Sequence, residues 1–94
     1  METTVNLYSN THGEISKFLT KFYNKDDIKL ENDLKWQNKY ANSIEIVDII
    51  GAFIDNKDKY DVNMWISLDD GLFININESN SNEIIKYLYE RYPY

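Results

Sequence analysis

The residues of this chain with the most obvious chemical potential lie in one short segment, Asn10-Thr11-His12-Gly13. His12 is the only histidine, and imidazole is the side chain best suited to proton transfer near neutral pH. Hydroxyl, amide and free helical N–H groups in the same segment are suited to holding an anion. However, Thr11 and Glu14 also have the spacing of a capping box at a helix start, and the amino end of a helix disfavours imidazolium. We therefore expect no catalysis by His12, and we keep Asn10, Thr11, His12 and Gly13 as a candidate anion site.

Two groups of acidic residues suggest metal binding or acid–base catalysis, but simpler explanations fit both. The run Asp55–Asp61 resembles a calcium-binding loop, yet it lacks the glycine and glutamate such a loop needs, and Lys57 and Lys59 interrupt it. Asp69-Asp70 has the composition of a turn, where carboxylates are solvated, whereas catalysis needs a carboxylate buried in a cleft. The chain has no cysteine, which excludes thiolate metal sites and thiol catalysis. We therefore expect no catalytic residues, no metal, no cofactor and no enzymatic activity.

The composition indicates one soluble domain. A chain of 94 residues with 43% hydrophobic content can bury one core without a disulfide or a metal. Its longest apolar run, Ile49–Ile54, is far shorter than the roughly 20 residues that a membrane-spanning helix needs. The first residues lack the basic and apolar pattern of a signal peptide, so we expect a cytoplasmic protein that does not bind membranes.

The net charge of −6 lies in the second half of the chain. Residues 1–42 carry six lysines against six acids, whereas residues 43–94 carry three lysines and one arginine against ten acids. Nucleic acids are bound by concentrated basic residues, and Lys17, Lys21 and Lys25 have the spacing of an ordinary solvated helix face. We therefore expect no nucleic acid partner, and we expect either a basic protein partner or self-association.

The segment Asp61–Asn77 predicts a β-hairpin around which the other elements pack. Apolar residues occupy every even position from Val62 to Leu68, and the same parity resumes from Leu72 to Ile76. Gly71 ends the three residues between the strands, where a left-handed backbone conformation favours glycine. This register places Leu68 opposite Leu72.

The remaining patterns predict two further strands and three helices, each helix preceded by a capping sequence. In chain order the elements that we expect are a strand over Thr3–Ser9, a helix from Glu14 to about Asn24, a polar loop over Asn24–Asp33, a strand over Leu34–Tyr40, a helix over Ile44–Asp55, the hairpin, and a helix from Ser81 that Pro93 ends.

The predicted order is therefore β-α-β-α-β-β-α, an α+β fold with a four-stranded mixed sheet. Right-handed crossovers would make the first two strands parallel and the hairpin antiparallel to them. This layout, together with the opening run from Val5 to Asn10, resembles the thioredoxin-like fold in its minimal, glutaredoxin-sized form. The resemblance implies the fold alone, because Ser9–Glu14 lacks the family's reactive cysteines and Asp61-Val62 stands where the family has a cis-proline. A redox-inactive module of this kind, holding a small anionic ligand in the first-helix loop, is our alternative function.

Aromatic residues give the strongest indication of a contact surface. Trp65 and Phe73 fall on the odd-numbered face of the hairpin, and Tyr8 has the parity to join them. Each side chain buries on the order of 150–250 Å², so a cover for this face is expected. The helix over Ile44–Asp55 is apolar around most of its circumference, and we expect it on the odd face, with the other two helices on the even face. A second subunit or a partner is the alternative cover.

The sequence thus favours a non-enzymatic protein-interaction domain of the inhibitor or immunity type. The residues that we expect at the partner contact are acids of the second half and exposed aromatic residues: Asp48, Asp55, Asp58, Asp61, Trp65, Phe73, Tyr89 and Tyr94.

Overall fold

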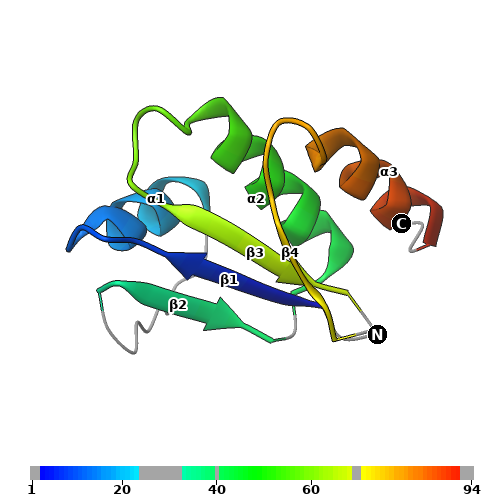
Figure 1. Cartoon of the computed structure of the whole chain (residues 1–94), viewed down its shortest axis with the longest axis horizontal. Helices are drawn as coiled ribbons and strands as arrows, with labels where there is room; N and C mark the ends of the chain where they lie inside the picture. Colours follow the sequence, from blue (N-terminus) through cyan, green and yellow to red (C-terminus); the bar gives the residue numbers. More distant parts are fainter. Residues whose placement is uncertain (1–2, 24–32, 40, 69–70, 92–94) are drawn as a thin grey trace.

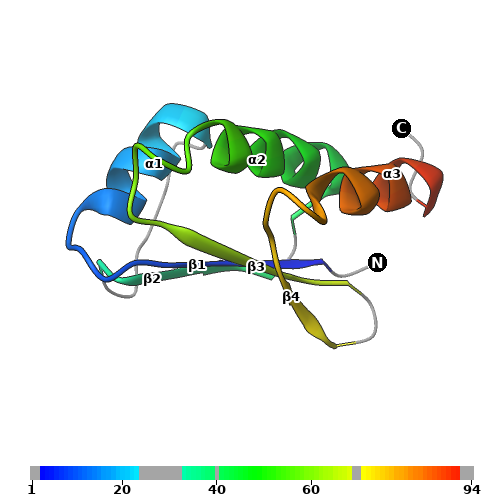
Figure 2. The same cartoon turned by 45° about the horizontal axis from the view of Figure 1, so that its top comes forward.

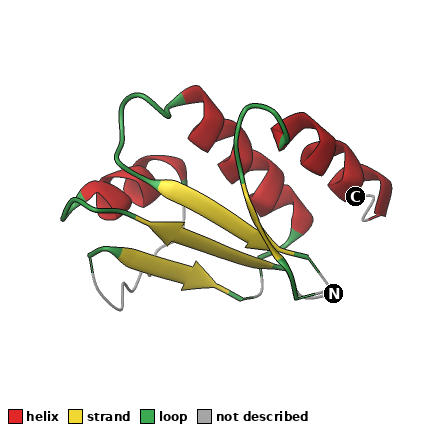
Figure 3. Ribbon diagram, viewed as in Figure 1, coloured by secondary structure: helices red, strands yellow, loops and turns green. Residues whose placement is uncertain are grey.

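The elements follow the predicted order in a computed structural model that describes residues 3–23, 33–39, 41–68 and 71–91 (Figures 1 and 3). They are β1 (Thr4–Tyr8), α1 (Glu14–Phe22), β2 (Lys35–Asn38), α2 (Ser43–Asp55), β3 (Asn63–Ser67), β4 (Phe73–Asn75) and α3 (Ser81–Arg91). The α+β class with one four-stranded sheet and three helices is confirmed. Most of the predicted loop after α1 lies outside the described residues.

The four strands form one antiparallel sheet with the order β2-β1-β3-β4. The predicted parallel pairing of the first two strands is therefore wrong, and the sheet is not mixed. The Ser9 amide donates to the Leu34 carbonyl at 3.0 Å, so β2 begins at the end of the sheet where β1 finishes. The chain between β1 and β2 contains α1, and β2 starts beside the end of β1 and runs in the opposite direction. A crossover to a parallel strand is consequently not required.

The hairpin has the register predicted from the sequence. Ser67 pairs with Phe73, and the next pair in the same register is Leu68 with Leu72, as predicted. Gly71 has a φ of 78°, and its amide donates to the Leu68 carbonyl at 3.1 Å. The left-handed glycine at the end of the turn is confirmed, and the two residues before it lie outside the described part of the chain.

All three helices lie on one face of the sheet, as Figure 2 shows. The predicted placement of α2 on the opposite face is therefore wrong. α2 lies between α1 and α3, so neighbouring helices and the sheet together cover most of its apolar surface, although Ile44 remains 51% exposed (Figures 1 and 2). The core is formed by these helices and the inward strand residues, and its fully buried large side chains are Phe18, Leu7, Ile15, Leu19, Ile46, Ile49, Ile50, Met64, Ile66, Ile76, Leu88 and Val5.

Gly51 in the middle of α2 provides a first test of the fold. A Cβ added there would meet no atom within 4 Å, whereas glycine inside a helix costs about 0.5–1 kcal/mol relative to alanine. We expect Gly51→Ala to raise the free energy of unfolding by about that amount in urea denaturation. Gly71→Ala is the matched control, and it should lower stability, because φ is 78° there although the space is equally open. A loss of stability in Gly51→Ala would contradict this description of α2.

Candidate functional site

The sheet face turned away from the helices is the main candidate, and we call it the bare face. It consists of the outward residues of the four strands: Thr4, Asn6 and Tyr8; Lys35 and Gln37; Asn63, Trp65 and Ser67; Phe73 and Asn75. Three of them are exposed aromatic residues, with exposed fractions of 39% for Tyr8, 38% for Trp65 and 50% for Phe73. These three side chains line an open pocket of about 400 Å³.

Strand alternation and register explain how the three aromatic residues come together. Val5 and Leu7 turn into the core, so Tyr8 turns outward from β1. Trp65 lies on β3 opposite Asn6, and Phe73 begins β4 opposite Ser67. No described helix covers this face, so these rings stay partly in water. Apolar surface costs about 25 cal/mol per Å² to leave in water, and contiguous exposed patches mark contact sites.

Asn6 is the polar group of the bare face that most needs a partner. Its side chain is only 2% exposed, and Nδ2 has no hydrogen-bond acceptor among the described residues. A buried donor without an acceptor costs about 1–3 kcal/mol, so such groups are uncommon in folded proteins.

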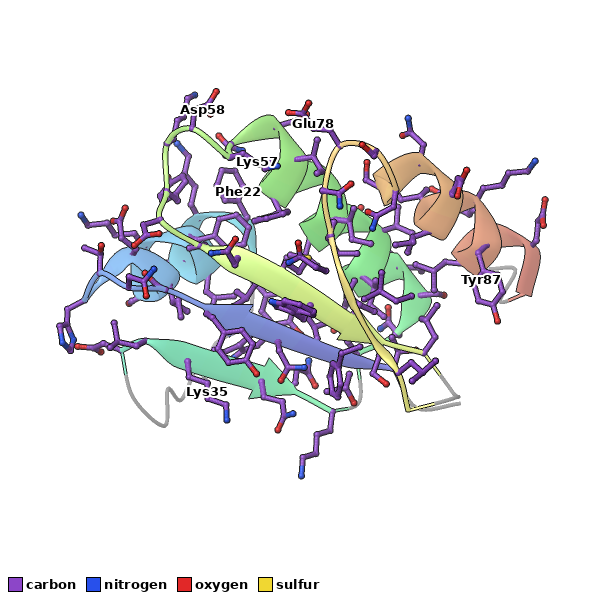
Figure 4. All side chains as sticks on the ribbon, in the orientation of Figure 1. Phe22, Lys35, Lys57, Asp58, Glu78 and Tyr87 are labelled. Atoms are coloured by element: carbon purple, nitrogen blue, oxygen red, sulfur yellow. The ribbon has the colours of Figure 1, made fainter. Side chains whose placement is uncertain are left out.

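The charge of the bare face differs from that of the whole chain. No aspartate or glutamate occurs in the four strands. Lys35 projects from β2, at one edge of the sheet, and its Nζ lies 6.0 Å from the centre of the Tyr8 ring (Figure 4). Lys39 follows β2 and Asp33 precedes it, and both are exposed and have the same parity as Lys35. The bare face is therefore neutral to positive on a chain with a net charge of −6.

The predicted partner-contact residues do not form one surface. Asp48 and Asp55 are exposed on α2, and Asp58 is exposed in the turn after it, so all three belong to the helix side of the molecule (Figure 4). Trp65 and Phe73 lie on the bare face. Tyr89 is exposed on α3, in the helix layer. Tyr94 lies outside the described residues.

Asp61 occupies the predicted anion site of the first-helix loop. One of its carboxylate oxygens accepts hydrogen bonds from the Thr11 hydroxyl at 2.7 Å and from the Asn10 amide at 3.2 Å. The Ser9 hydroxyl lies 3.5 Å from the same oxygen. The loop therefore does hold an anion, but the anion is a carboxylate of the same chain. Asp61 was predicted as a partner contact, and the structure gives it this internal role.

The predicted capping box at the start of α1 is wrong because Asp61 engages both of its residues. The Thr11 hydroxyl donates to the Asp61 carboxylate, and the Glu14 carboxylate accepts from the Asp61 amide at 3.2 Å. The residue before the helix is instead Gly13, with a φ of 87° and no side-chain cap. His12 is exposed, and its Nδ1 lies 3.4 Å from Asp33 at the surface.

A second polar cluster, around Tyr23, was not predicted from the sequence. The buried Tyr23 hydroxyl donates to Glu45 at 2.8 Å and accepts from the Asn38 amide, and the ring lies edge-on to Trp36. Glu45 also receives a hydrogen bond from Asn42, whose side chain caps α2 as expected. Burial and the negative charge of Glu45 raise the pKa of Tyr23 to about 12. This cluster ties α1, β2 and α2 together, which is a structural role.

Alkaline titration should detect this tyrosine. Because the pKa of Tyr23 is raised from 10.0 to about 12 in the folded chain, its contribution to stability is complete below pH 10 and is lost as the pH rises through 12. We expect the tyrosinate absorbance of the folded chain to include one late-titrating group, which Tyr23→Phe removes. An unchanged titration curve in Tyr23→Phe would contradict the assignment.

Comparison of the chain with models of known protein families, with characterised proteins and with solved structures gives no match in any of the three. Within the described residues, no group of three or more His, Cys, Asp or Glu side chains is placed to hold a metal ion. In the same part of the chain, no helix has the length and apolarity needed to cross a membrane.

Sequence analysis predicted that Tyr8, Trp65 and Phe73 share one face of the sheet. It did not predict that Asn6, Lys35 and Gln37 belong to the same face. The alternation of β1 placed Asn6 beside Tyr8, and this was the available signal. Lys35 and Gln37 join them only through the pairing of β2 with β1, which is a contact between distant segments.

Proposed function

We propose that this chain is a cytoplasmic, non-enzymatic protein-interaction domain that acts by binding another protein, as inhibitors and immunity proteins do. The bare face is the proposed binding surface. The observation that supports this most strongly is the group of three exposed aromatic residues, Tyr8, Trp65 and Phe73, around one pocket on a face without acids.

Physical features of protein interfaces support the proposal. Aromatic residues are enriched in the cores of interfaces, and binding energy concentrates in a few large side chains that sit in a desolvated centre. Trp65 and Phe73 stand on paired strands of a packed sheet, so their backbone positions are fixed before binding. A rigid surface loses less conformational entropy on association than a loop does.

The alternative function, a redox-inactive module that binds a small anion in the first-helix loop, has less support. The Thr11 hydroxyl and the Asn10 amide already donate to Asp61, and a free anion would have to displace that carboxylate. An intramolecular carboxylate is always present at high effective concentration, whereas an external ligand must compete with it.

Affinity capture with matched variants tests the proposal. One bait carries Trp65→Thr and Phe73→Thr on the bare face, and a control bait carries Asp48→Asn, Asp55→Asn and Asp58→Asn on the helix side. We expect a partner from the native cell lysate to be retained by the wild type and the control, and to be lost by the bare-face variant. Retention by the bare-face variant with loss by the control would place the interface on the acidic helix side instead.

A further inference from the structure

We propose that the bare face binds an acidic segment of its partner, which inserts an apolar side chain between Tyr8, Trp65 and Phe73 and places carboxylates on Lys35 and Lys39. This inference rests on the proposed function, because it specifies the chemistry of the partner that the bare face would bind.

The distribution of charge carries the argument. Lys35 is the one charged residue of the four strands, and its Nζ lies 6.0 Å from the centre of the Tyr8 ring that lines the aromatic pocket. Exposed Lys39 follows β2, and exposed Asp33 precedes it. Lysine is depleted in interfaces, because burying an ammonium group without a counter-charge is costly. A partner carboxylate offsets this cost through a charge-assisted hydrogen bond, whereas a basic partner would add repulsion.

The acids on the helix side do not prevent this association at physiological salt. Asp48 and Asp55 project from the outer surface of α2, roughly 15 Å from the sheet, given the usual spacing and diameter of packed helices. The Debye length is about 8 Å at physiological ionic strength, so these charges are largely screened at the bare face. Lys35 is then the charge nearest to the aromatic pocket among the residues of the four strands.

A protein segment fits the bare face better than a nucleic acid strand does. Nucleic acid binding depends on neutralising many phosphates with basic residues, and the bare face with Lys39 offers two lysines on a chain of charge −6. A segment with one or two carboxylates and an apolar side chain matches the two lysines and the pocket.

Selection from a library of random linear peptides displayed on phage tests the inference without knowledge of the partner. The library is panned on the immobilised chain, and synthetic peptides from the selected pool are measured by fluorescence anisotropy. We expect the pool to be enriched in Asp and Glu beside an aromatic or aliphatic residue. Lys35→Glu with Lys39→Glu should weaken binding about tenfold or more, which corresponds to about 1.4 kcal/mol.

Two controls separate the inference from the proposed function. Lys57→Glu with Lys59→Glu makes the same change in net charge on exposed residues of the helix side and should leave binding within about twofold, as expected for remote surface charges. Trp65→Thr with Phe73→Thr reports whether the peptides use the bare face.

The outcomes distinguish the two proposals, which are that the bare face is the interface and that its partner is acidic. Some results would contradict the acidic partner and leave the bare face as the interface. In these results the peptides fail to bind the Trp65 and Phe73 variant, but they are basic, or their affinity does not change in the Lys35 and Lys39 variant. Peptides indifferent to Trp65 and Phe73, or an empty selection, would overturn both. Binding of an oligothymidylate probe that depends on Lys35 would show that the bare face takes nucleic acid instead.

Discussion

Replacing Asp61 by alanine is expected to lower the free energy of unfolding by about 2–3 kcal/mol, because hydrogen bonds to a charged acceptor contribute more than neutral ones do. The substitution removes the acceptor of the Thr11 hydroxyl and of the Asn10 amide. These bonds join the loop before α1 to the start of the hairpin, about 50 residues later in the chain. Urea denaturation monitored by circular dichroism measures the change.

Asp58→Ala is the control for Asp61→Ala. Asp58 is exposed, lies three positions earlier and carries the same charge, so its replacement should change stability by no more than about 0.5 kcal/mol. Asp61→Asn keeps one acceptor oxygen and should fall between Asp61→Ala and the wild type. Equal stability of Asp61→Ala and Asp58→Ala would show that the loop is not held by this carboxylate.

Threonine substitutions on the two faces of β3 are expected to have very different consequences. Trp65→Thr with Phe73→Thr should lower stability less than Ile66→Thr does, because the two aromatic residues are 38% and 50% exposed and threonine favours strands. Ile66→Thr should cost about 2–4 kcal/mol, because Ile66 is fully buried and a hydroxyl group would enter the core. Thermal unfolding of the two variants in parallel measures this contrast.

This comparison tests the one-sided architecture itself. If a helix covered the bare face, the Trp65 and Phe73 variant would be at least as destabilised as Ile66→Thr. If the helices pack only on the inner face, the variant folds normally and remains available for binding experiments. A severe loss of stability in the Trp65 and Phe73 variant would contradict the description of this surface as bare.

Periodicity predicted most of the buried hairpin residues but not which layer covers them. The even-numbered residues of the hairpin were expected to share one buried face; Met64, Ile66 and Ile76 are buried, whereas Leu72, next to the turn, is 67% exposed. The position of α2 was wrong because an apolar helix surface can be covered by neighbouring helices as well as by a sheet. An apolar pattern predicts that a surface is buried, but it does not predict which element packs on that surface.

Long-range contacts also explain why the first-helix loop was interpreted incorrectly. Thr11 and Glu14 have the spacing of a local capping box. In the structure, however, the Thr11 hydroxyl donates to the Asp61 carboxylate and the Asp61 amide donates to Glu14, although Asp61 lies far away in the sequence. Likewise, the direction of β2 is fixed by its pairing with β1, a contact between distant segments that the residues of β2 do not reveal. Local patterns were reliable for Asn42 and Gly71, where the partner atoms lie within three residues.

Fluorescence quenching of Trp65 tests the proposed interface most directly. The chain has two tryptophans, and Trp36 is buried, so a Trp36→Phe chain reports on Trp65 alone. Acrylamide is neutral, and it should quench Trp65 efficiently in the free chain, where 38% of the residue is exposed. In the complex with a captured partner or a selected peptide, the bare-face interface predicts a strongly reduced quenching constant and a shift of the emission to shorter wavelength. Equal quenching of Trp65 in the free and bound chain would show that the partner binds elsewhere.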